Sequence, residues 1–123
     1  MFELKILSHF SAAHQLTMVA KKCENLHGHN WKVEVCVQGE RLNEAGVLVD
    51  FGILKGYVRE IMGRLDHRFL NELPDFENTP PSSENLAVYI AENLQAMIDV
   101  PGVVVNRVTT WESDDACATY FPK

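Results

Sequence analysis

Residues 23–38 have the sequence CENLHGHNWKVEVCVQ, and the rest of the chain can be placed around them. From Trp31 onward, apolar and polar residues alternate with the two-residue period of a half-buried β-strand. Continuing that period backwards places His27 and His29 on the same side as Trp31. Two imidazoles that point the same way form half of a metal site, and imidazole nitrogen is a good ligand for zinc. A His-Gly-His tripeptide is also compatible with a turn that carries two exposed imidazoles, so other residues must decide.

The pattern on both sides of this strand predicts an α+β fold, with an antiparallel sheet and both helices on one face. Asp50 and either Ser82 or Ser83 are expected to cap the two helices, because their side chains can accept hydrogen bonds from first-turn amides. The first helix runs to about Leu65, and Pro101 with the glycine after it stops the second. The predicted strands are residues 2–16, 31–38, 47–49, 103–111 and 116–121, with a hairpin turn at 39–46 and a loop at 17–25.

Length and composition restrict the class of protein. A chain of 123 residues suits one domain, residues 1–123, and its net charge of −6 argues against bulk binding to nucleic acid. No apolar run is long enough to span a membrane, and no basic segment followed by an apolar one marks a secretory signal. The three cysteines, Cys23, Cys36 and Cys117, are an odd number, which favours reduced thiols in a cytoplasmic protein.

His14 is the natural third partner for His27 and His29. It ends the first predicted strand, which should lie beside the strand of the other two histidines. Three neutral imidazoles with one open position are typical of a catalytic zinc site, since structural sites usually close with four protein ligands. The alternative for His14 alone is a partly buried histidine that bonds to the backbone.

Side chains at three further places in the sequence fit proton-transfer or binding chemistry. Cys23 lies in a loop beside the predicted metal site, where a thiol pKa can be lowered. Asp66 and His67 follow the first helix and can form a proton relay, or His67 can simply be stabilised by the helix dipole. Glu112 ends a strand, where it is either solvated or, in a pocket, a bidentate acceptor for a planar pair of N–H groups.

Six pieces of the sequence follow one another in a recognisable order and spacing. They are Phe10-Ser11-Ala12-Ala13-His14, Cys23-x-x-x-His27-Gly28-His29-Asn30, Val49-Asp50-Phe51-x-x-Leu54-Lys55, Leu65-Asp66-His67-x-x-Leu70-Asn71, Ser83-Glu84-Asn85-Leu86-Ala87 and Glu112. Together they resemble the 6-pyruvoyltetrahydropterin synthase / 6-carboxytetrahydropterin synthase family nearly from end to end. The length is similar to that of the shorter bacterial members, the 6-carboxytetrahydropterin synthases of queuosine (7-deazaguanine) biosynthesis.

The resemblance implies a tunnelling fold, a four-stranded antiparallel sheet with two helices on one face, assembled into homotrimers or hexamers with active sites at interfaces. It implies that zinc is bound by three histidines and that Cys23 is the general base. It further implies a relay, an anchor for the pterin 2-amino and N3 groups, and a segment that lines the pterin site from a neighbouring subunit. These assignments are His14, His27 and His29 for zinc, Asp66 and His67 for the relay, Glu112 for the anchor, and Ser83 and Glu84 for the segment.

The implied reaction is zinc-dependent conversion of 7,8-dihydroneopterin triphosphate to 6-carboxy-5,6,7,8-tetrahydropterin, with release of acetaldehyde and triphosphate. Two other products stay open: the 6-pyruvoyl pterin, and the 6-hydroxymethyl pterin of the folate branch, in which a glutamate such as Glu24 acts in this loop. A different class is a non-enzymatic zinc- or pterin-binding module. A spare thiol at Cys23 with an Asp66-His67 relay argues against that class, because a structural zinc site needs neither.

Overall fold

The computed structural model describes residues 1–16 and 26–123, except the side chain of His27. The predicted α+β class is confirmed, but the sheet has five strands rather than four, in the order β3-β1-β2-β4-β5. The helices and strands are β1 (Phe2–His14), β2 (His27–Gly39), α1 (Phe51–Leu65), β3 (Arg68–Phe69), α2 (Ser83–Met97), β4 (Val104–Ser113) and β5 (Ala116–Tyr120), with short 3₁₀ turns at Leu70–Glu72 and Pro74–Phe76.

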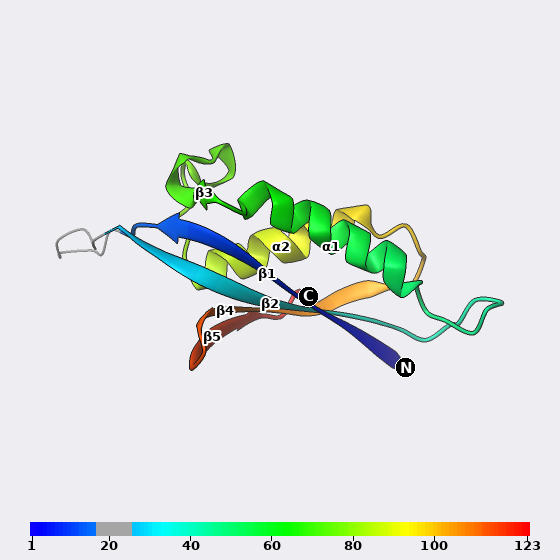
Figure 1. Cartoon of the computed structure of the whole chain (residues 1–123). Coiled ribbons are helices and arrows are strands. Elements are labelled where there is room, and N and C mark those ends of the chain that lie inside the picture. Colours follow the sequence, from blue (N-terminus) through cyan, green and yellow to red (C-terminus); the bar gives the residue numbers. More distant parts are fainter. Residues whose placement is uncertain (17–25) are drawn as a thin grey trace.

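Both helices cover the same face of the sheet (Figure 1). The helices cover the face to which β1 and β2 direct their apolar side chains, and these side chains are therefore buried. Phe10 and Ala12 are buried on β1, and Trp31 is fully buried on β2. The antiparallel register pairs His14 with His27 and Ala12 with His29. The prediction that the first two strands are neighbours is therefore confirmed. Their pairing brings together the two strand ends that carry the histidines.

The two helices begin where side-chain caps were predicted. Asp50 accepts a hydrogen bond from the amide of Ile53 at 3.1 Å. Of the two serines considered for the second helix, Ser82 is the cap and accepts from the amide of Asn85 at 3.1 Å. Each cap satisfies a donor that the first helical turn leaves without a backbone partner.

The predicted strand at residues 47–49 is wrong, so the turn predicted at 39–46 does not connect the two strands of a hairpin. The amide of Asn43 donates to the carbonyl of Val47, and the Asn43 side chain accepts from the Val47 amide, so this segment is a turn closed on itself. Leu48 and Val49 are nevertheless buried, at 4% and 7% exposure. These residues are apolar because they anchor the connection before α1 in the core, and not because they pair in the sheet.

The sequence pattern also missed β3 and shifted the strand ends. β3 has two residues and pairs in parallel with β1 at Ala12 and Ala13. A two-residue strand is too short to show any periodicity. β1 ends at His14 and β2 already begins at His27. The predicted loop at 17–25, with Cys23 and Glu24, lies outside the described residues.

Among the described residues, neither helix is long and apolar enough to cross a membrane.

Candidate active site

His14 is fully buried at the end of β1, and both of its ring nitrogens face acceptors. Nδ1 lies 2.8 Å from the carbonyl oxygen of Pro81, and Nε2 lies 3.0 Å from Oε1 of Glu112. Because a carbonyl can only accept, Nδ1 carries the proton, and a neutral ring then presents a lone pair at Nε2. That lone pair would face a carboxylate oxygen, an arrangement that needs a cation between the two groups or a proton on Nε2.

His29 meets the same carboxylate. Its Nε2 lies 3.1 Å from Oε1 of Glu112, whose side chain is 35% exposed. One ligand atom from each of His14, His29 and Glu112 lies within 4.8 Å of the other two. Two imidazoles and a carboxylate at this separation match the nitrogen and oxygen ligands that zinc takes. The described residues therefore fit a metal ion at this position.

Trp31 holds the two imidazoles in place. The His14 and His29 rings meet the Trp31 ring edge-to-face, with centroids 5.2 and 5.4 Å away. Phe10 stacks on Trp31 at 5.8 Å. Aromatic side chains of a closely packed core restrict the rotamers of the rings they touch. The alternation of β1 and β2 thus supplies both the ligand candidates and the packing that orients them.

The third predicted ligand, His27, can be placed only by its backbone. It pairs with His14 across the β1–β2 ladder, and its side chain is outside the described part of the structure. Glu112, predicted as a pterin anchor, is the group that contacts the two described histidines. The ligand set of three histidines and the anchoring role of Glu112 both stay predictions.

Asp66 and His67 form a second polar group at the edge of β1. Nδ1 of His67 lies 2.9 Å from Oδ2 of Asp66, and Oδ1 of Asp66 accepts from the Ser11 amide at 2.8 Å. Asp66 and His67 meet because His67 has a left-handed backbone, with φ 58°, while its amide donates to the Ser11 carbonyl. Their catalytic role stays a prediction.

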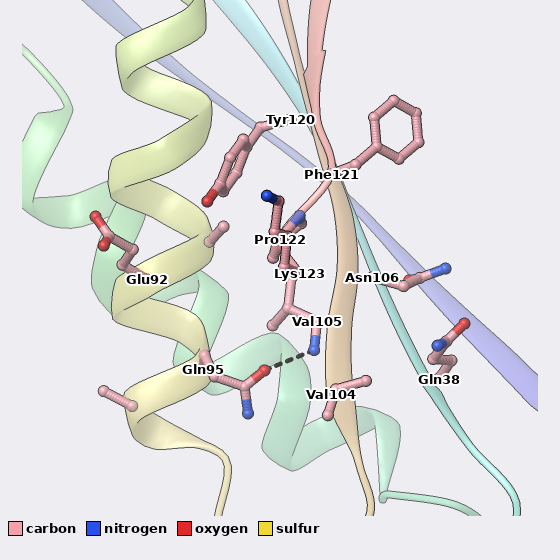
Figure 2. Close-up of a pocket in the computed structure, with 12 residues that line it drawn as sticks. Gln38, Glu92, Gln95, Val104, Val105, Asn106, Tyr120, Phe121, Pro122 and Lys123 are labelled. Carbon is pink, nitrogen blue, oxygen red and sulfur yellow. Dashed lines mark hydrogen bonds between the residues drawn. The ribbon is translucent and has the colours of Figure 1, made fainter.

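An open hollow of about 480 Å³ connects the two polar groups, since its lining includes both His29 and His67. A larger hollow of about 930 Å³ lies between α2 and the C-terminal end of the chain (Figure 2). Among the described residues, its polar lining includes Gln95 and Asn106 but no histidine or cysteine. The smaller hollow is therefore the one that the chemistry favours.

The remaining predicted site residues lie around α2 or outside the described residues. The Ser83 carbonyl accepts from Oγ1 of the buried Thr110 at 2.7 Å, and the Glu84 side chain is exposed in the first turn of α2. Cys23 is outside the described residues. The Pro81 carbonyl was missed as a partner of His14, and no side-chain pattern could have shown it.

The pH dependence of stability tests the Asp66 contacts. Hydrogen bonding from the Ser11 amide, helped by His67, lowers the pKa of Asp66 in the folded protein. A lowered folded pKa stabilises the fold above the unfolded value of about 4, and this contribution is lost as pH falls through the folded pKa. We expect Asp66→Ala to destabilise the protein at pH 6.5 and to have a smaller effect at about pH 3, which lies below the unfolded pKa of about 4.

Denaturant unfolding of both proteins at the two pH values measures this. Asp114→Ala removes the same charge from an exposed position on the β4–β5 turn and is the control. An Asp66→Ala penalty that is equal at both pH values would show that the carboxylate charge contributes nothing.

Comparison with known proteins agrees with this geometry. A family profile described as 6-pyruvoyl tetrahydropterin synthase matches residues 3–123. A putative 6-carboxy-5,6,7,8-tetrahydropterin synthase of Archaeoglobus fulgidus is 39% identical, over 92% of this chain and 90% of the relative. Human 6-pyruvoyl tetrahydrobiopterin synthase is 37% identical, over 90% of this chain and 85% of the relative. The structure of Caenorhabditis elegans 6-pyruvoyl tetrahydropterin synthase superposes with a TM-score of 0.87 at 28% identity, covering 99% of this chain and 96% of that one. The chain therefore belongs to the 6-pyruvoyl tetrahydropterin synthase family.

Proposed function

We propose that this protein is a zinc-dependent lyase of queuosine biosynthesis, acting in the cytoplasm. It converts 7,8-dihydroneopterin triphosphate and one water molecule to 6-carboxy-5,6,7,8-tetrahydropterin, acetaldehyde and triphosphate. The observation that carries the proposal is the convergence of His14, His29 and Glu112 beside a hollow that also borders His67. Relatives with the 6-carboxy and the 6-pyruvoyl names are almost equally similar, at 39% and 37% identity, so identification of the product decides between the two reactions.

The chain's own residues would bind and orient the reacting groups. His14, His27 and His29 would hold the zinc ion, which as a Lewis acid lowers the pKa of hydroxyl groups that bind it. The Pro81 carbonyl keeps the Nδ1 proton on His14 and so leaves Nε2 for the metal. Trp31 limits the movement of both described rings.

Proton transfer is assigned to Cys23 and to His67, of which His67 borders the hollow. Cys23 as a thiolate would remove a proton from the substrate side chain, and His67 would return one elsewhere. Asp66 bonds to Nδ1 of His67, so Nε2 is the nitrogen left for exchange. The His67 side chain is 82% exposed, which leaves it open to the substrate.

Glu112→Gln separates the two roles that Glu112 can have. As the pterin anchor, a carboxylate accepts charge-assisted hydrogen bonds worth about 1.5–3 kcal/mol, so its loss should lower kcat/KM by roughly 10- to 100-fold. We expect the variant to keep its zinc, measured by elemental analysis beside steady-state kinetics. Glu92→Gln, on α2 beside the larger hollow, is the matched control. Loss of zinc from Glu112→Gln would instead make Glu112 a metal ligand.

Product identification tests the reaction itself. Purified protein is incubated with 7,8-dihydroneopterin triphosphate, and the pterin and aldehyde are identified by mass spectrometry. A 6-carboxy pterin with acetaldehyde supports the proposal, whereas a 6-pyruvoyl pterin or a 6-hydroxymethyl pterin would move the protein to another branch. A zinc-loaded protein that leaves the substrate unchanged would favour a non-enzymatic binding module.

We also propose that the protein is a homotrimer or hexamer with active sites between subunits. Ser83 and Glu84 would then line the pterin site of a neighbouring subunit, which is compatible with the exposed Glu84 at the start of α2. The mass in solution, measured by light scattering, checks the assembly. A monomer that is fully active would contradict the interfacial site.

A further inference from the structure

Among the described residues, the segment 66–71 borders the outer edge of β1 along the part that leads to His14. At one end, the amide of Ser11 donates to the Asp66 side chain and the Ser11 carbonyl accepts from the His67 amide. In the middle, β3 pairs with Ala12 and Ala13. The last contact is to Gln15, directly after His14, and it is made by the side chain of Asn71.

The Asn71 amide takes the place of a strand residue. Its Oδ1 accepts from the Gln15 amide at 2.9 Å, and its Nδ2 donates to the Gln15 carbonyl at 2.7 Å. One side chain thus bonds both backbone groups of one residue, as the opposite residue does in a hydrogen-bonded pair of an antiparallel ladder, although β3 itself pairs with β1 in parallel. The backbone cannot do this here, because the chain has left β3 and formed a 3₁₀ turn from Leu70 to Glu72.

Leu70 explains why the side chain takes over at this point. It is fully buried, and turning the chain inward to bury it removes the backbone from the sheet edge. Without Asn71, the edge groups of Gln15 would lose these partners, and the end of a strand frays most easily where its bonds are missing. His14 is the last residue of β1, so it is next to any such fraying.

We propose that Asn71 is a positioning residue for the metal centre, because its amide completes the sheet edge at Gln15 and fixes the end of β1 that carries His14. The inference rests on the proposed function in one respect only, that His14 binds the metal. It gives a role to the last residue of the Leu65-Asp66-His67-x-x-Leu70-Asn71 pattern.

The test is the zinc affinity of metal-free protein, measured by competition with a chromophoric chelator. Changing residues that support metal ligands typically weakens binding by 10–100-fold, and we expect about 10-fold for Asn71→Ala. Asn71→Asp keeps an acceptor for the Gln15 amide but turns an oxygen toward the Gln15 carbonyl. It should therefore weaken zinc binding by about as much or more, again on the order of 10-fold.

Gln95→Ala is the matched control. The Gln95 side chain is also an amide that bonds to the backbone at a strand end, since it accepts from the Val105 amide at 2.7 Å near the start of β4 (Figure 2). Glu112 lies at the other end of that strand. We expect Gln95→Ala to lower the thermal midpoint, as the Asn71 variants do, but to keep zinc affinity within about twofold because distant sites act independently.

The outcomes separate this inference from the proposed function. Asn71 variants that are destabilised like Gln95→Ala but bind zinc like the wild type would overturn the positioning role alone. A wild-type protein that binds zinc but does not turn over the pterin would overturn the proposed reaction and leave the positioning role intact. A wild-type protein that binds no zinc would overturn both.

Discussion

Replacing His14 with alanine is expected to remove zinc from the protein and to lower kcat/KM by about 10³-fold or more, the scale of several kcal/mol that a Lewis-acidic ion supplies. His14 is the buried member of the cluster, and its two nitrogens join the Pro81 carbonyl to the Glu112 carboxylate. Elemental analysis and steady-state kinetics on one preparation measure both effects.

His9→Ala is the control for this variant, because His9 lies on the same strand with an exposed side chain. It should keep both zinc and activity. A His14→Ala protein with full zinc content and full activity would exclude His14 from the metal site. Since removing a buried ring can unfold the protein, His14→Gln serves as a second variant that preserves polar contacts, and circular dichroism establishes that each variant is folded.

Replacing Cys23 with alanine is expected to lower the rate by at least ~10²-fold while zinc stays bound, which is the usual scale for a positioned acid–base group. The reason is that the substrate proton would lose its acceptor, whereas the imidazoles that hold the metal are unchanged. Single-turnover kinetics with 7,8-dihydroneopterin triphosphate measure the rate of the chemical step, and elemental analysis measures the zinc.

Cys117→Ala is the matched control, since Cys117 is an exposed thiol on β5. It should turn over at the wild-type rate. A Cys23→Ala protein with the rate of the wild type would remove Cys23 from the mechanism and assign proton abstraction to another group, with His67 as the first candidate.

The features that could be predicted from the sequence are those with a repeating or local cause. The alternation from Trp31 onward placed the middle of β2 and the face of His29 correctly, because one side of the strand is buried, although β2 begins earlier, at His27. The Asp50 cap was predicted because its contact lies only three residues away. The apolar pattern also gave both helices, whose buried residues form one stripe each.

The features that could not be predicted depend on contacts between distant segments or on backbone geometry. The Pro81 carbonyl reaches His14 across 67 positions, and a backbone group has no signature in the sequence. The pairing of Asp66 with His67 needs the left-handed backbone of a non-glycine residue. The apolar residues at 47–49 satisfied a strand pattern, yet Asn43 closes that segment as a turn. Burial alone does not distinguish a strand from a buried connection.

The most direct test of the metal-centre proposal is the turnover of 7,8-dihydroneopterin triphosphate by the wild-type protein before and after zinc is removed with a chelator, with metal content measured in the same samples. We predict that turnover disappears with the zinc and returns when zinc alone is added back. Undiminished turnover by protein shown to be free of metal would contradict the proposal.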